Sequence, residues 1–122
     1  MHAALRSSLA ELSASPPALR AAVSTDRGGR HDGRRVCASA QQTLDRLGPV
    51  ATLGESDTAA RLLLAAAAEE ASWAWRMLQA ADAPSPGVAA AVAVLADHAA
   101  DCCDEALRLL AIPAPGEPGD RP

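Results

Sequence analysis

The chain has 122 residues with 15 acidic and 11 basic side chains, so its net charge is −4 at neutral pH. A chain of this length makes one domain with a single core, and its acidity argues against general nucleic-acid binding, since contacts to phosphates supply most of that affinity. Ala and Leu dominate the composition, whereas aromatic residues make up only 2%. Because Ala and Leu favour helix and the residues that strands prefer are scarce, the composition predicts an all-α fold.

The uncharged apolar segments of the chain are short. Arg6 and Glu11 interrupt the N-terminal region before it reaches the apolar length of a secretory signal. The longest uncharged apolar runs, 62–68 and 87–96, fall far short of the roughly 20 residues of a membrane span. Three cysteines are an odd number and indicate reduced thiols rather than a disulfide framework. We therefore expect a cytoplasmic protein with no membrane partner.

Two short helices are expected at the start of the chain, over about 2–13 and 16–25. Ser15 followed by Pro16 and Pro17 is typical of a helix start, because a proline in the first turn lacks only an N–H that the helix does not use. The residues that we expect to face inward are Leu5, Leu9, Leu12, Leu19, Ala22 and Val23.

A Gly/Arg-rich loop, 24–35, and a third helix over about 34–47 follow. We expect the loop to be flexible and solvated, with a role in binding an anion as the alternative. The apolar residues of the third helix recur at steps of three and four, which places them on one face. They are Cys37, Ala40, Leu44 and Leu47.

Two long helices are expected in the second half, over about 57–82 and 86–111, and Ser85 with Pro86 is typical of a helix start. In both, apolar residues alternate at steps of three and four, the heptad pattern of a coiled-coil seam. Because the turn between them is short, the pattern predicts a long antiparallel αα-hairpin. The seam residues are Ala60, Leu64, Ala67, Ala71, Ala74 and Leu78 in the first helix and Val88, Val92, Leu95, Ala99, Cys102, Ala106 and Leu109 in the second.

The predicted organisation is a single Ala/Leu-rich up-down bundle of four to five helices over 1–112, with a disordered Pro/Gly-rich tail at 113–122.

The charged residues are divided unevenly between the two halves of the chain. Residues 1–50 carry seven Arg and four acidic residues (+3), and residues 51–122 carry four Arg and eleven acidic residues (−7). The halves are thus complementary, and we expect them to pack against each other, with head-to-tail self-association as the alternative.

The segment DHAADCCDE, 97–105, is the strongest candidate for a chemical site. On a helix, His98, Asp101, Cys102 and Glu105 fall within an arc of about 100°. Imidazole and thiolate are ligands of Zn(II) and Cu(I), and a carboxylate from Asp101 or Glu105 completes a zinc shell. Cys37 is a further ligand candidate, from the third helix. The alternative interpretation is that Cys102 is a small core residue beside a solvated acidic face.

The segment EEASWAWRM, 69–77, suggests an interaction surface made of Trp73, Trp75 and Met77. Two tryptophans two residues apart on a helix do not point into the same core. Because Trp75 shares its face with polar side chains, we expect Trp75 to be the exposed one and an interface anchor. The alternative is that a short N-terminal helix covers it.

No catalytic constellation stands out, so we expect no enzymatic activity. The leading hypothesis is a small interaction or regulatory module that binds a protein partner or a second copy of itself as a homodimer, without a cofactor. The second hypothesis is a Zn- or Cu-binding bundle. A bundle that holds a small ligand or an enzyme site between its helices is the third.

Overall fold

A computed structural model of the chain describes residues 2–23, 34–46, 55–80 and 84–111, and these form five α-helices and no strand. The helices are α1 (His2–Leu12), α2 (Ser15–Val23), α3 (Arg34–Arg46), α4 (Glu55–Gln79) and α5 (Pro86–Leu110). The all-α prediction is confirmed. The predictions for 24–33 of the loop, for Leu47 and for the tail at 113–122 lie outside the described residues.

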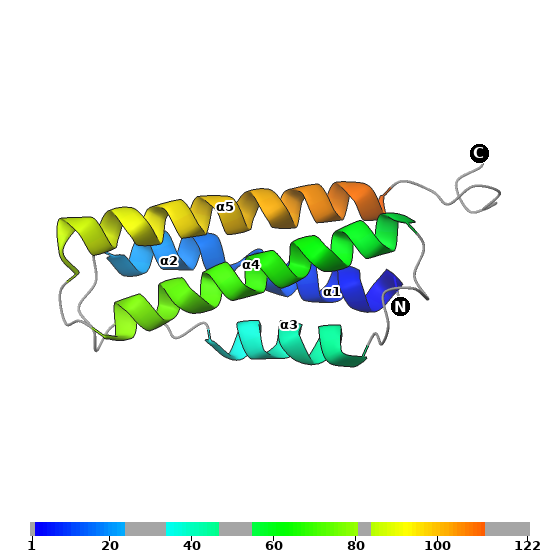
Figure 1. The fold of residues 1–122 in the computed structure, drawn as a ribbon, viewed down its shortest axis with the longest axis horizontal. Coiled ribbons are helices and arrows are strands. Elements are labelled where there is room, and N and C mark those ends of the chain that lie inside the picture. Colours follow the sequence, from blue (N-terminus) through cyan, green and yellow to red (C-terminus); the bar gives the residue numbers. More distant parts are fainter. Residues whose placement is uncertain (1, 24–33, 47–54, 81–83, 112–122) are drawn as a thin grey trace.

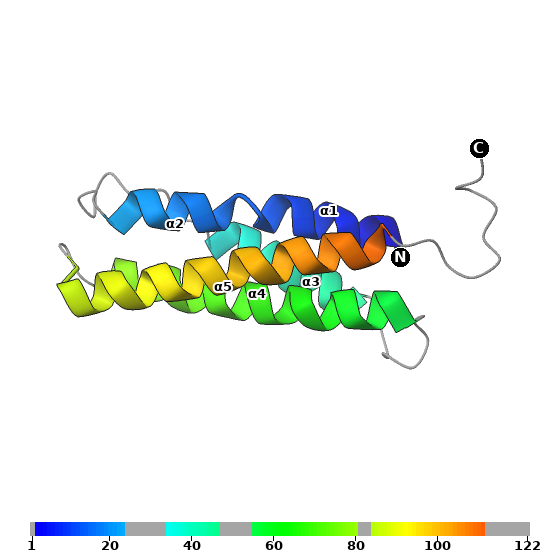
Figure 2. The same cartoon turned by 90° about the horizontal axis from the view of Figure 1, so that it is seen from above.

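Helices α1 and α2 form one broken column, so the bundle has four columns in all (Figures 1 and 2). The break follows from the sequence, because Pro16 and Pro17 supply no N–H to the carbonyl groups one turn before them. Ser13 closes the end of α1, donating its N–H and its hydroxyl to the carbonyl oxygen of Leu9 at 2.9 and 2.7 Å.

Helices α4 and α5 run antiparallel and side by side along their lengths (Figures 1 and 2). All six seam residues of α4 are fully buried, and in α5 Val92, Ala99, Cys102 and Ala106 are buried, whereas Val88, Leu95 and Leu109 are half-buried. Ser85 caps α5 as predicted, accepting a hydrogen bond from the Val88 N–H at 3.2 Å, with Pro86 next in the chain. Since four of the six seam residues of α4 are alanine, the two helices can approach closely.

The N-terminal helices close the bundle with apolar and polar contacts. Leu5, Leu9, Leu12 and Leu19 are fully buried. The buried Ser8 hydroxyl of α1 donates to Thr43 Oγ1 of α3 at 2.7 Å, which satisfies a polar pair inside the core. Buried polar pairs of this kind fix which helix faces meet.

Arginines of the first half reach α5, as the division of charge predicts for packing within one chain. Arg20 of α2 forms an ion pair with Asp97 of α5. Arg6 of α1 donates to the carbonyl oxygen of Leu110 at 3.0 Å. That carbonyl lies in the last turn of α5, where a cation also opposes the negative end of the helix dipole.

Helix α5 is long and apolar enough, by length and composition alone, to cross a membrane. Core helices of soluble proteins pass the same test. In this structure 28% of the apolar window of α5 is buried, including Val92, Ala96 and Ala99. The absence of a membrane partner stays a prediction.

The predicted orientation of the two tryptophans is wrong: Trp75 is fully buried, whereas the exposed fraction of Trp73 is 52%. Helix α4 contacts α1, α2 and α3 as well as α5, so its buried surface extends beyond the seam to the flank that carries Ala68 and Trp75. Ser72 and Gln79 lie on the same flank, and their polarity led to the prediction that this flank faces solvent. In the structure both residues are half-buried, so the flank is not a fully exposed face. The alternative, that N-terminal helices cover Trp75, fits the observed burial.

We predict that Trp75→Ala lowers the free energy of unfolding by about 3–5 kcal/mol, because it leaves a large cavity in the core. The matched variant Trp73→Ala should change it by less than about 1 kcal/mol, because its side chain is half in solvent. Urea unfolding followed by circular dichroism at low micromolar protein measures both. Equal effects of the two variants would contradict the burial described above.

Candidate metal centre

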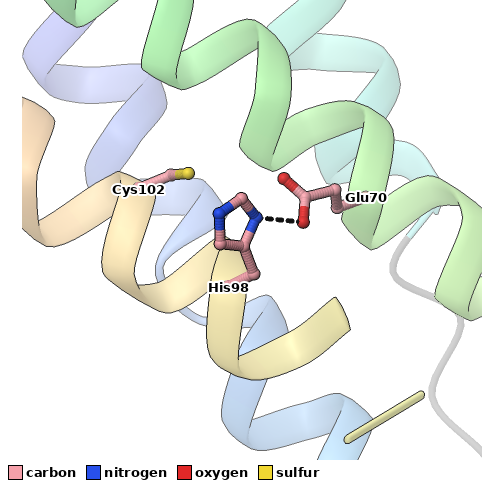
Figure 3. Close-up of side chains that lie close together, drawn as sticks. All are labelled: Glu70, His98 and Cys102. Atoms are coloured by element: carbon pink, nitrogen blue, oxygen red, sulfur yellow. Dashed lines mark hydrogen bonds and ion pairs between the residues drawn. The ribbon is translucent and has the colours of Figure 1, made fainter. Parts of the chain in front are cut away.

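Three potential ligands converge where the middle of α4 meets α5. They are Glu70 of α4 and His98 and Cys102 of α5, whose donor atoms all lie within 4.8 Å of one another. Figure 3 shows Glu70 and His98 facing each other across the two helices, with the thiol of Cys102 beside them. His98 and Cys102 are four residues apart, so the helix places them one turn from each other on the same side.

The imidazole of His98 is held by the carboxylate of Glu70. Nδ1 donates a hydrogen bond to Oε2 of Glu70, an interaction that becomes an ion pair when the ring is protonated. The hydrogen bond fixes the orientation of the ring, and a metal ion bound between the two side chains would take the place of its proton. The side chain of His98 is 62% exposed and that of Glu70 is 20% exposed, so the cluster is open to solvent on the His98 side.

Cys102 forms the inner wall of the cluster and is 6% exposed. Burial raises the pKa of its thiol, and the negative charges of Glu70 and Asp101 raise the pKa further. Two carboxylates and a thiol make an electronegative pocket in which a cation would favour the thiolate. Cys102 is therefore a buried seam residue, as the heptad pattern predicts, and its role as a metal ligand stays a prediction.

The other predicted ligands lie outside the three convergent donors. Asp101 is exposed and acts on Cys102 through its charge. Glu105 is held by Arg108, which donates from Nε at 2.9 Å and lowers the pKa of the carboxyl group. Cys37 lies on α3 and lines a groove between α3 and α4. Glu105 and Cys37 are therefore not among the convergent donors, because the carboxylate of Glu105 is paired with Arg108 and the thiol of Cys37 lies on another helix, and their roles as ligands stay predictions.

Glu70 is the ligand that sequence reasoning missed. In an antiparallel hairpin with a short turn, residues equally far from the turn lie opposite each other. Glu70 lies nine residues before the end of α4 at Gln79, and His98 lies twelve residues after the start of α5 at Pro86. The predicted hairpin therefore places the two residues within about one helical turn of the same level, but it does not single out Glu70 as the partner of His98.

Thiol, imidazole and carboxylate also occur in this order in cysteine nucleophile sites, but the electrostatics differ here. An activated thiol has a lowered pKa, as beside an imidazolium or a helix N-terminus. At Cys102 the pKa is raised. The cluster is therefore better suited to hold a cation than to supply a nucleophile.

The three residues of the predicted interface differ in their exposure to solvent. Trp73 is exposed, Trp75 is buried and Met77 is half-buried against the core. Beside Trp73 lies an open groove of about 680 Å³ between α3 and α4, which we call the α3–α4 groove. It is lined by Cys37, Ala38, Gln41, Ala65, Ala68, Glu69, Ser72, Trp73 and Arg76.

A comparison with protein families, with curated proteins and with solved structures finds no match to this chain. The function is therefore argued from its side chains alone.

We predict that the free energy of unfolding falls as the pH rises from about 9 towards 11. The pKa of Cys102 is raised from 9.0, and burial raises that of Cys103 to about 11, so the unfolded chain loses these protons first. Fewer bound protons in the unfolded state mean that stability falls with pH, by up to about 1.4 kcal/mol per pH unit for one group. The chain has neither Lys nor Tyr, so only its thiols titrate in this range.

Urea unfolding in a series of buffers measures this slope. Cys103→Ala should flatten it, whatever its effect on stability at neutral pH. A stability that is constant between pH 9 and 11 would show that the two thiols are not held protonated by the fold.

Proposed function

We propose that this protein is a small metal-binding helical bundle that holds one Zn(II) ion between α4 and α5, with Glu70, His98 and Cys102 as protein ligands. The observation that carries the proposal is the convergence of three donors from two helices. Nitrogen, sulfur and oxygen donors of these kinds are the usual zinc ligands in proteins.

The donor set favours zinc over copper. Cu(I) selects thiolate and thioether sulfur, and the cluster contains one thiol, with a carboxylate as its third donor. A carboxylate is a hard donor that Zn(II) accepts and Cu(I) does not prefer.

Three protein ligands leave one position of a tetrahedral zinc ion to water or another ligand. The exposed side of the cluster, next to His98, is where solvent has access. The site therefore supports a metal that exchanges with its surroundings rather than one enclosed by four protein ligands.

Zinc bound in this position would join α4 to α5. An ion that binds the folded state alone stabilises it by about 2.7 kcal/mol when its free concentration is about a hundredfold above Kd. If the free zinc concentration in the cell varies across that range, zinc binding would change the stability of the folded protein, and this change would give the metal a regulatory role. The cytoplasmic location that we predict would place the thiol in a reducing compartment.

We predict that the purified protein binds one Zn(II) per chain and that Cys102→Ser, His98→Ala and Glu70→Gln each weaken binding by at least about a hundredfold, since loss of a ligand costs more than loss of an outer partner. Isothermal titration with zinc gives the stoichiometry and Kd. Co(II) in place of zinc gives a thiolate charge-transfer band that Cys102→Ser should remove.

Glu69→Gln is the matched control, because it removes a carboxylate adjacent in sequence but outside the cluster. Asp101→Asn should weaken binding less than Glu70→Gln does, since it acts through charge alone. Retention of zinc by all three ligand variants, or loss of it in Glu69→Gln to the same degree, would overturn the proposal.

We also predict that the zinc affinity rises about tenfold per pH unit between pH 7 and 8.5, because binding releases the thiol proton of Cys102. The raised pKa of that thiol keeps it protonated throughout this range. Titration in buffers of different ionisation enthalpy counts the released protons. Binding without proton release would exclude Cys102 as a thiolate ligand.

A further inference from the structure

We infer that the exposed face of α4 around Trp73 pairs with the same face of a second copy of this chain, in an antiparallel α4–α4 contact about a twofold axis. The partner is argued from the apolar surface, from the groove beside it and from the order of charges along α4. None of these rests on the metal centre.

The apolar part of this face consists of Trp73 and Leu62, whose exposed fractions are 52% and 62%. They are eleven residues apart, about three helical turns, so they lie on the same side of α4. A half-exposed tryptophan leaves a large apolar ring in contact with solvent, and the chain has only two tryptophans. Tryptophans are among the commonest anchors of protein interfaces.

The α3–α4 groove begins at Trp73 and offers room for a side chain of a second copy. Its walls include Ala38, Ala65 and Ala68, whose short side chains leave open the space above them. Its volume of about 680 Å³ exceeds that of an indole ring several times. A tryptophan of one copy can therefore be received at the groove of the other.

The charges on this face match a second copy in antiparallel orientation. Glu69 and Arg76 are equally distant from the midpoint between Ser72 and Trp73. A twofold axis through that midpoint sets Glu69 of each copy opposite Arg76 of the other, and this reciprocity is what an isologous interface requires. The same relation pairs Ala65 with the exposed Ala80, so small side chains meet on either side of the centre.

These two charges are available for such contacts. Within the described part of the chain, Arg76 lies over the Trp73 ring at 5.1 Å from its centroid, and neither Arg76 nor Glu69 has an ion pair. Arg76 therefore stands beside the indole that would be buried, in position for an acidic group from another molecule. Trp73 would lie next to the axis, opposite Ser72 of the second copy.

Sedimentation velocity over a concentration series tests the inference, with refractive-index detection because removing a tryptophan changes the absorbance. The wild-type chain should show a monomer–dimer equilibrium, and Trp73→Ala should raise the dimer Kd about thirtyfold or more, as loss of a central anchor does. Val94→Ala is the matched control, since Val94 is 66% exposed on α5 and outside this face.

A charge exchange tests the orientation. Glu69→Arg and Arg76→Glu should each weaken the dimer, because each sets like charges opposite each other, and the double variant should restore it. The series is run with chelator and again with zinc, so that an effect of Glu69→Arg on the neighbouring Glu70 is separated from dimerisation.

A wild-type chain that stays monomeric up to millimolar concentration would overturn the inference. So would open-ended association beyond the dimer, which indicates a head-to-tail contact, or a double variant no tighter than the single ones. None of these outcomes bears on zinc binding by Glu70, His98 and Cys102.

Discussion

The packing of α5 against the alanine-rich seam of α4 is the constraint on which the rest of the molecule depends. Ala60, Ala67, Ala71 and Ala74 are fully buried in α4, and side chains this small let two helix backbones come near each other. At that separation a short side chain such as Cys102 and a carboxylate such as Glu70 can reach the same point. Larger seam residues would hold the helices apart and the donors with them.

The acidic side chains of α5 are not equivalent once the bundle is formed. Asp97 is paired with Arg20 of α2, and Glu105 with Arg108 one turn later in its own helix. Between these two neutralised positions, Asp101 and Glu70 act together to raise the pKa of Cys102. The negative charge that acts on Cys102 therefore comes from Glu70 and Asp101, and a cation placed beside the thiol would be attracted by both.

The sequence was sufficient to predict the helices and the buried faces that follow from periodicity. It was insufficient to predict features that depend on how further helices pack against the α4–α5 pair. The heptad steps in α4 and the Ser-Pro start of α5 are local, and both match the structure. Which of Trp73 and Trp75 is buried depends on where α1, α2 and α3 pack, and the polarity of neighbouring turns carries no information about that. Glu70 lies between these cases, because the predicted hairpin places it within about one turn of the level of His98 but does not fix which side chains meet.

Consecutive residues of α4 serve different surfaces because each step along a helix turns the side chain by about 100°. Glu69 belongs to the face around Trp73, Glu70 to the metal cluster and Ala71 to the seam with α5. A zinc ion on Glu70 would restrain the same turn of helix whose next face carries Glu69. Zinc at Glu70 and a second copy at Glu69 would therefore act on the same turn of α4 from two different faces.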